Sequence, residues 1–521
     1  MGIRKMVSGV DMQNGNGRIP IRISVTGHRL IEKACLPALS AAVKSTIEAI
    51  REKVPDSEIM LASNMAEGAD QICSGIAKEL SVPYIAVLPF EKEEYEKDFE
   101  GDARLHFQSM LEDARQVFCI CSAEDAGRDR DACYRKAGEY LADHCHLLLT
   151  LSNGENADPN GCGAAEIAEY ASENGVPVLV LHTPREGEDP SRAGETTSFL
   201  NRELFFRTLK QTNRYNRDCG TLSPGEMPEL LPGTSGRIQQ IADAYRFSDE
   251  LSNRFLKKYL RVLRVLAVLG LLFTLSFLLY DELNLHFLIF CCGGFLLLSF
   301  LVLQTVKKAQ IHGRYISFRV LAENMRVQAF LLYAGSSLEV PKILLWTQKY
   351  EYPWIAFAVS SLLFGKEKQE PHDIRIFWLE GQRDYHRTVL MNDGKIKRAA
   401  LILRMALIVS ILTYLFAFCL ELFLCRTLSP AAAEQLRTVV KIVVGTFSAA
   451  TLFTANYYGK LSLGRKRTDS GKMAEFFDAA LKEQEGKTVD EAFLLKVARE
   501  ELSENGNWYS YMKDNAPDLG I

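Results

Sequence analysis

Two long apolar hairpins constrain the fold of this chain more than any other feature of its sequence. Residues 259–306 contain two apolar runs of about 20 residues each, separated by the polar connector DELNL. A helix of this length crosses a hydrocarbon core about 30 Å thick, because each residue adds about 1.5 Å. A second pair of apolar runs occupies residues 398–458. The sequence therefore predicts four transmembrane helices, and the rest of the chain is expected to act at a membrane.

Basic residues at the ends of the hairpins predict their orientation. The first connector carries Asp281 and Glu282 but no lysine or arginine, whereas the second outer loop carries Arg426 and Arg437. The flanking cations are Lys257, Lys258, Arg261, Arg264, Lys307, Lys308 and Arg314 for the first hairpin, and Lys395, Lys397, Arg398, Arg404, Lys460, Arg465, Lys466 and Arg467 for the second. The positive-inside rule then places both termini in the cytoplasm. We expect a multi-pass protein of a bacterial inner membrane.

Composition excludes several other classes of protein. A net charge of −4 argues against a basic nucleic-acid-binding face, so we expect no direct nucleic-acid partner. The 12 cysteines show no CxxC or Cys/His ligand spacing. This favours free thiols in a reducing compartment over disulfides or a zinc site. The first 17 residues lack the apolar core of a signal peptide, so we expect no cleaved leader.

The first part of the chain alternates short apolar strands with helical patterns. The predicted strands cover residues 18–25, 58–63, 83–88, 116–121, 146–151 and 177–182. This alternation is typical of an α/β fold, a Rossmann-like doubly wound parallel sheet. Ligands of such sheets bind beyond the carboxyl ends of the strands. The residues that follow each strand are therefore the candidate site.

Three of these strand-to-helix turns have the chemistry of an anion site. Gly27, His28 and Arg29 follow the first strand, residues 64–70 follow the second, and a glycine-rich turn at residues 159–166 opens a helix. Backbone N–H groups at such a turn, together with the helix dipole, favour a phosphate. The alternative is that the glycines only permit tight turns. Three such turns at one edge favour a nucleotide-like ligand.

An acidic segment, EKEEYEKDFE, occupies residues 91–100 after the third strand. One interpretation is a solvated helix or loop. The other is a lid over the ligand, in which Tyr95 or Phe99 stacks on a base.

Four motifs together carry a resemblance to a known family. VTGHR, LASNMAEGAD, LPFEKEEYEKDF and LTLSNGENADPNGCGAAEIAEYASENGVPVLVL resemble the SLOG superfamily in order and spacing, over about residues 18–185. SLOG domains are Rossmann-like and include DNA-uptake proteins, the Lonely Guy phosphoribohydrolases and nucleotide sensors of bacterial immunity. The resemblance implies ligand contacts from Gly27, His28, Arg29, Glu67, Gly68, Asp70, Asn153, Gly154, Gly161, Gly163 and Glu166, and the lid interpretation adds Tyr95.

The sequence departs from the hydrolases of that family at one motif. Their PGGxGTxxE pattern is PNGCGAAE here, with Asn160 and Ala164 at the altered positions. The departure favours a sensor over an enzyme and leaves enzymatic activity open. The enzymatic alternative is a membrane-anchored nucleotide hydrolase or N-glycosidase that uses Glu166 with Arg29. Glu166 also suits a plain helix N-terminal acid.

The remainder of the chain resembles the SLATT class of membrane effectors over about residues 250–515. The similarity lies in RVLAENMRVQAFL, in WLEGQRDYH, and in a cytoplasmic helix that follows each hairpin. An apolar stretch at residues 353–365 is too short to cross comfortably, and we interpret it as buried, interfacial or re-entrant. Glu421 and Asn456 are candidate polar positions of a pore.

These patterns combine into one functional hypothesis. A cytoplasmic sensor binds a nucleotide-derived second messenger, made by a partner enzyme, and an oligomeric effector permeabilises the membrane in antiphage defence; no cofactor or metal is expected. The rival hypothesis without a ligand is a constitutive channel or scaffold. The expected division of the chain is a flexible N-terminus (1–17), a ligand-binding domain (18–220), a linker and helix (221–258), the first hairpin (259–306), a cytoplasmic helical region (307–397), the second hairpin (398–458) and a helical tail (459–521).

Overall fold

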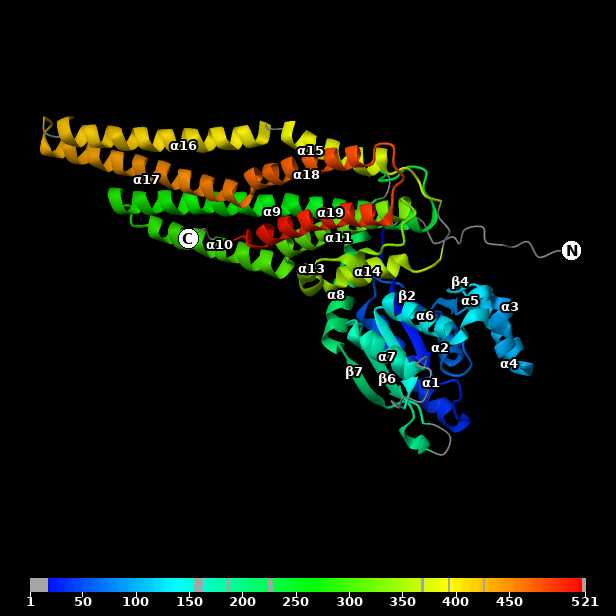
Figure 1. The fold of residues 1–521 in the computed structure, drawn as a ribbon. Coiled ribbons are helices and arrows are strands. Elements are labelled where there is room, and N and C mark those ends of the chain that lie inside the picture. The colour runs from blue at the N-terminus through cyan, green and yellow to red at the C-terminus, as the bar shows by residue number, and fades with distance from the viewer. Residues whose placement is uncertain are drawn as a thin grey trace. The chain divides into compact units, whose positions relative to one another are not determined.

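The computed structural model describes residues 17–153, 163–184, 188–223, 228–366, 370–391, 394–424 and 427–517. The chain forms two compact units, each built from two separate segments. Unit 1 comprises Met1–Ser248 and Leu321–His372, and unit 2 comprises Asp249–Val320 and Asp373–Ile521. Figure 1 labels the elements of both.

The predicted α/β class is confirmed in unit 1, which contains a seven-stranded sheet in the order β4-β3-β2-β1-β5-β6-β7. Its strands are β1 (Ile21–Gly27), β2 (Ile59–Ser63), β3 (Tyr84–Leu88), β4 (Gln116–Cys119), β5 (Leu147–Ser152), β6 (Val178–His182) and β7 (Thr196–Leu200). The first six pair in parallel, and β7 pairs antiparallel with β6. The six parallel strands match those predicted from the sequence, whereas β7 was not among the predicted strands.

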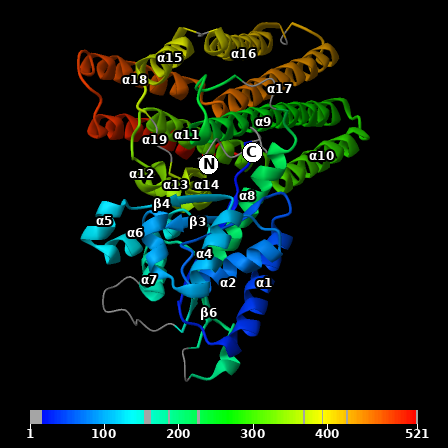
Figure 2. The ribbon, with the colours of Figure 1, turned by 90° about the vertical axis from the view of Figure 1, so that its right-hand side faces the viewer.

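The helices of unit 1 cover the sheet by burying one apolar stripe each. In α1 (Leu36–Lys53) the buried residues Leu39, Val43, Ile47 and Ile50 recur at helical spacing. Helices α1 and α2 (Ala69–Glu79) pack against each other (Figure 2). The crossover helices α6 (Arg130–Asp143) and α7 (Ala164–Glu173) also pack as a pair. Strands β1, β2, β3 and β5 are almost entirely buried, as expected for a sheet covered by helices.

The segment Leu321–His372 completes unit 1 although a predicted hairpin separates it from the sheet in sequence. It contains the short helices α12 (Val340–Ile343), α13 (Trp346–Glu351) and α14 (Pro353–Leu363). Helix α14 packs against α8 (Arg202–Cys219) and buries the indole of Trp354. The apolar stretch at residues 353–365 is therefore a buried helix of unit 1.

Four helical runs in the described part of the chain are long and apolar enough to cross a membrane. They are Gly236–Leu283, Leu288–Tyr333, Arg375–Phe423 and Pro430–Glu483. These runs contain α9 (Gly236–Leu283), α10 (Leu288–Ala309), α11 (Ile311–Tyr333), α15 (Gly381–Met391), α16 (Gly394–Cys419), α17 (Pro430–Lys460) and α18 (Leu463–Glu483). Many apolar side chains along them are exposed, among them Phe290, Phe300 and Phe416. Such surfaces are stable against lipid rather than water.

Glycines allow close helix packing within unit 2. A Cβ on Gly270 of α9 would lie 2.4 Å from the Phe453 ring of α17, and one on Gly445 would lie 2.7 Å from Leu278. Helices α16 and α17 also lie side by side in both views (Figure 1, Figure 2). Small residues at such contacts are the usual basis of helix association in membranes.

Candidate functional site

A pocket of about 480 Å³ opens at the carboxyl edge of the sheet. Its walls come from the turn after β1, the turn after β2, and the helices α6 and α7. The strand order reverses between β1 and β5, because β2 to β4 continue on one side of β1 and β6 on the other side of β5. The pocket therefore lies at the topological switch point, where doubly wound sheets bind their ligands.

Two glycines allow the turn after β1 to approach the start of α2. A Cβ on Gly27 would lie 2.4 Å from the Ala69 side chain and 2.7 Å from the Leu151 carbonyl oxygen. Gly68 has φ +86°, and a Cβ there would lie 2.2 Å from the Arg29 carbonyl oxygen. Both residues are thus required by the backbone geometry, as the tight-turn alternative proposed. Gly27 also lines the pocket.

His28 connects the β1 turn to the end of β5. Its Nε2 atom lies 3.1 Å from the backbone nitrogen of Asn153, whose N–H donates to the ring. The amide side chain of Asn153 in turn donates to Glu188 at 3.2 Å. His28 lines the pocket. Asn153 contacts the His28 ring but does not itself line the pocket.

Arg29 supplies a positive charge to the pocket. Its guanidinium lies over the Tyr134 ring at 5.0 Å from the ring centre. Burial alone would lower the pKa of Arg29, but Tyr95 and the hydrogen bond with Tyr134 outweigh it and raise that pKa. The side chain therefore stays charged and can neutralise an anionic ligand group.

Asp70 is a buried carboxyl in the first turn of α2. Burial raises its pKa to about 7, against the opposing effects of the Ala66 N–H and the Arg29 charge. The Ala66 N–H donates to Asp70 Oδ2 at 3.2 Å. Asp70 therefore titrates near neutral pH, and the charge of the pocket changes with pH.

Two buried acceptor oxygens of the pocket have no hydrogen-bond partner among the described residues. They are Oδ1 of Asn64 and Oε2 of Glu166. A buried polar atom without a partner is costly, and in a binding site it predicts a complementary group on the ligand. Asp131 also lines the pocket. Together these oxygens favour a ligand that donates hydrogen bonds through hydroxyl or amino groups.

The acidic segment forms α3 (Lys92–Tyr95) and the short helix η2 (Glu96–Asp98). The ring of Tyr95 lines the pocket but is buried among other aromatic rings, namely Phe90, Phe99, Phe107 and Tyr134. Arg130 holds the segment in place, since its guanidinium pairs with Glu94 at 2.6 Å and with Asp98. Stacking of Tyr95 on a base remains a prediction.

The structure brings most of the predicted ligand residues together. Seven of them line the pocket: Gly27, His28, Arg29, Asp70, Tyr95, Gly163 and Glu166. Glu67 and Gly68 belong to the same turn as Asp70 but do not line the pocket. Gly154 and Gly161 lie outside the described residues. The sequence analysis missed Asp131, Tyr134 and Gly138, which α6 contributes.

Nothing in the described ranges forms a group of three or more His, Cys, Asp or Glu side chains suited to a metal ion. In unit 2 the pore candidate Glu421 pairs with Arg437 at 2.7 Å, and both side chains are substantially exposed. Asn456 is half-buried in α17. A role for Glu421 or Asn456 in a pore stays a prediction.

Comparison with known proteins assigns no family: no protein-family model matches the chain, and no curated protein matches it.

Proposed function

We propose that unit 1 senses a nucleotide-derived second messenger, of cyclic nucleotide or ADP-ribose type, and gates a membrane effector formed by unit 2. The observation that carries the proposal is the position of the pocket at the switch point between β1 and β5. The resemblance of four sequence motifs to SLOG domains supports the nucleotide class.

The chemistry of the pocket suits the two ends of a nucleotide. Arg29 and the first turn of α7 line the same cavity, and a guanidinium together with the N–H groups of a helix start favours phosphate oxygens. Asn64 and Glu166 offer acceptors to ribose hydroxyls or to an exocyclic amine. A volume of about 480 Å³ is within the ordinary range for a small-molecule site.

The four membrane-length helices support an output at a membrane. In this proposal an oligomer lies in the bacterial inner membrane with its termini in the cytoplasm, and ligand binding opens it. Its permeabilising activity belongs to antiphage defence, in which a partner enzyme makes the signal. A shift from 1:99 to 99:1 requires that the ligand favour the open state by about 5.5 kcal/mol, which several sites in one oligomer reach together.

One observation favours a second function. Glu166 has an oxygen without a partner among the described residues, and it lies in the same pocket as the charged Arg29. A nucleotide hydrolase or N-glycosidase would use such a pair. Whether the bound ligand survives therefore separates a sensor from an enzyme.

The test uses the full chain in lipid nanodiscs, because residues 321–372 complete unit 1. The protein is incubated with cyclic dinucleotides, cyclic trinucleotides, NAD and ADP-ribose derivatives. Calorimetry measures binding, and chromatography of the same samples measures ligand survival. Dye release from proteoliposomes measures permeabilisation.

Arg29→Ala is the diagnostic variant, and Arg128→Ala is its matched control. Arg128 is exposed, pairs with Glu124 one helical turn away, and does not line the pocket. We expect one ligand to bind, to be recovered intact and to release dye, with binding lost in Arg29→Ala alone. Consumption of the ligand would establish the enzyme, and dye release without any ligand would establish the constitutive channel.

A further inference from the structure

Helices α6 and α7 connect the two edges of the sheet. Their N-terminal halves line the pocket at the carboxyl edge, with Asp131 and Tyr134 on α6 and Glu166 on α7. Helix α6 has 14 residues, so it is about 21 Å long, and it ends just before β5 begins. A ligand that displaces the pocket wall therefore moves helices whose far ends lie at the amino edge.

The two helices are in close contact along this path. A Cβ on Gly138 of α6 would lie 2.7 Å from the Ile167 side chain of α7. Nearer the amino edge, the Tyr170 hydroxyl donates to Asp143 Oδ1 at 3.0 Å. Close packing transmits displacement rather than absorbing it, so α6 and α7 move as a pair.

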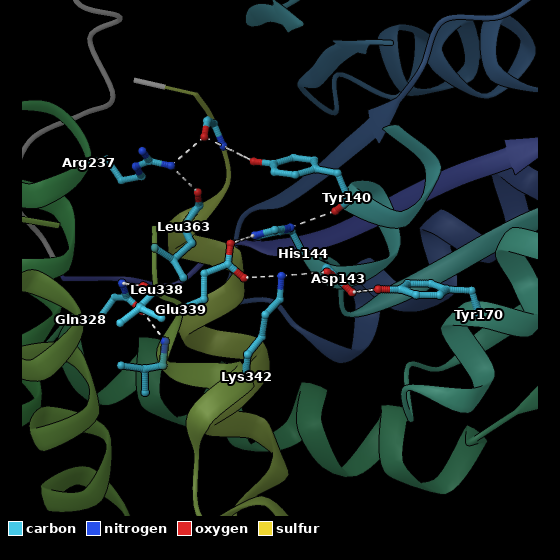
Figure 3. A network of polar contacts seen from close by, with 12 residues as sticks. Tyr140, Asp143, His144, Tyr170, Arg237, Gln328, Leu338, Glu339, Lys342 and Leu363 are labelled. Carbon is cyan, nitrogen blue, oxygen red and sulfur yellow. Dashed lines mark hydrogen bonds and ion pairs between the residues drawn. The ribbon is translucent and has the colours of Figure 1, made fainter. Parts of the chain in front are cut away.

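The end of α6 carries a network of charged groups, drawn in Figure 3. The fully buried ring of His144 lies 3.3 Å from Glu339 Oε1. Lys342 Nζ bridges Glu339 Oε2 at 3.0 Å and Asp143 Oδ2 at 3.1 Å. Burial opposes ionisation of Glu339, but the hydrogen bonds from His144 and Lys342 prevail and lower its pKa to about 2. The Glu339 carboxylate therefore stays charged, and it holds the segment that carries Glu339 against the end of α6.

The segment that carries Glu339 is fastened to α11 on both sides. The Gln328 amide donates to the Leu338 carbonyl at 3.1 Å and accepts from the Val340 N–H at 2.7 Å. Gln328, labelled in Figure 3, belongs to α11, which begins at Ile311 directly after α10 and forms the second half of the candidate run Leu288–Tyr333.

A second branch of the network reaches α9. The Gly365 N–H donates to the Tyr140 hydroxyl of α6 at 2.8 Å. The Arg237 guanidinium donates to the carbonyl oxygens of Leu363 at 2.9 Å and of Gly365 at 2.7 Å. Arg237, labelled in Figure 3, lies in the first turn of α9, and the whole of α9 is the first candidate run Gly236–Leu283.

We propose that this network is a coupling joint that transmits occupancy of the pocket to α9 and α11. The coupling joint consists of Tyr140, Asp143, His144, Tyr170, Arg237, Gln328, Glu339 and Lys342. The inference rests on the proposed function and supplies the regulation of its site. Charged groups with discrete partners exchange those partners instead of deforming gradually, so a small shift at the pocket becomes a change of contacts at both helices.

Coupling is reciprocal, so breaking the coupling joint must change the stability of the helices that wall the pocket. Lys342→Met removes the bridge between Asp143 and Glu339, and the matched control is Lys349→Met, which replaces an exposed lysine of α13. Hydrogen–deuterium exchange is measured on the full chain in nanodiscs without ligand. We expect the amides of α7 from Ile167 onward, whose N–H groups are hydrogen-bonded within the helix, to exchange about fivefold faster or more in Lys342→Met, the lower end of ordinary allosteric coupling, and to be unchanged in Lys349→Met. Equal rates at the pocket in both variants would overturn the proposal.

A second pair of variants tests coupling in the opposite direction, from the pocket wall to the coupling joint. Gly138→Ala forces α6 and α7 apart at the pocket wall, whereas Gly127→Ala on α5 (Ala123–Arg128) meets nothing within 4 Å. The Val340 and Gly365 amides report directly, because each bonds to a side chain of the joint. We expect both to exchange faster in Gly138→Ala alone, with β2 unchanged. If β2 also exchanges faster, Gly138→Ala has destabilised unit 1 as a whole. The comparison of Lys342→Met with Lys349→Met then decides whether the joint couples to the pocket. Because no ligand is present, failure here is distinct from failure of nucleotide binding.

Discussion

The two edges of the sheet in unit 1 differ in where their buried polar groups lie relative to the pocket. At the carboxyl edge, acceptor oxygens of Asn64 and Glu166 are buried without partners among the described residues. At the amino edge, Ser361 donates to the Pro20 carbonyl at 2.8 Å, Arg22 donates to the Ser361 carbonyl at 2.8 Å, and Gln328 satisfies two backbone groups. Nη1 of Arg22 and Nε1 of Trp354 at the amino edge are also buried without a partner among the described residues, but these two residues do not line the pocket, whereas Asn64 and Glu166 do. An unpaired polar group in a pocket can be satisfied by a ligand. The carboxyl edge is therefore the candidate binding edge.

The largest expected effect comes from the core of the amino edge. Trp354→Ala removes an indole that is 1% exposed and packs near the Tyr215 ring, with 6.0 Å between ring centres. Truncation of a buried tryptophan costs about 3–5 kcal/mol through lost contacts and a cavity. Native-state hydrogen exchange on β5 measures the free energy of opening of unit 1. Trp346→Ala is the control, because that side chain is 73% exposed. Equal losses in the two variants would contradict a structural role for the amino edge.

The next effect is a pH dependence that originates at the carboxyl edge. Burial raises the pKa of Asp70 from 3.8 to about 7, so the folded chain holds a proton that the unfolded chain has released between these values. The resulting stability is complete below pH 3.8 and is lost as pH rises through 7. At about 1.4 kcal/mol for each unit, the loss is on the order of 4 kcal/mol.

Asp70→Asn should remove this dependence and raise the free energy of opening at pH 8. Glu339 gives the opposite sign at the amino edge, because its pKa falls from 4.5 to about 2. Its contribution is present above pH 4.5 and is lost as pH falls through 2. Exchange on β5 at pH 5 and pH 8 checks the first statement. A wild-type profile identical to that of Asp70→Asn would disprove it.

A matched pair of amide truncations sharpens the comparison. Gln328→Ala leaves the Leu338 carbonyl and the Val340 N–H without their side-chain partner, which costs about 1–3 kcal/mol. Asn64→Ala removes an acceptor that has no partner in the described structure, so its effect without ligand stays within about 0.5 kcal/mol. The same exchange measurement compares them. If Asn64→Ala is the more destabilising variant, the distinction between the edges fails.

Sequence patterns predicted the carboxyl edge better than the amino edge. Continuous apolar runs indicated β1 to β6, and the residues that follow such strands are fixed in space by the sheet, which is why Gly27, Arg29 and Asp70 were found. Tyr134 was missed because the side of a crossover helix that faces the pocket depends on how that helix packs. Strand β7 was missed because TTSFL is half-exposed and contains only two large apolar residues.

The amino edge depends on contacts between distant parts of the chain. The apolar stretch around Trp354 predicted burial, but a hydrophobic pattern does not name its partner. Arg22 and Ser361 are 339 residues apart, and Tyr140 and Gly365 are 225 apart. Single polar residues at such separations carry no periodic signal, so the coupling joint was visible only in the structure.

The smallest expected effect tests whether α6 and α7 are joined at the amino edge by more than packing. Tyr170→Phe removes the hydroxyl that donates to Asp143 at 3.0 Å but keeps the ring. Asp143 retains Lys342 at 3.1 Å, so we expect a loss toward the lower end of the range of about 0.5–1.5 kcal/mol for one hydrogen bond. Tyr350→Phe is the control, because that ring is 68% exposed. Since the hydrogen bond joins the two helices that wall the pocket, its loss should speed exchange in α7 more than in β5. Uniform acceleration of both would mean that Tyr170 only stabilises unit 1 as a whole.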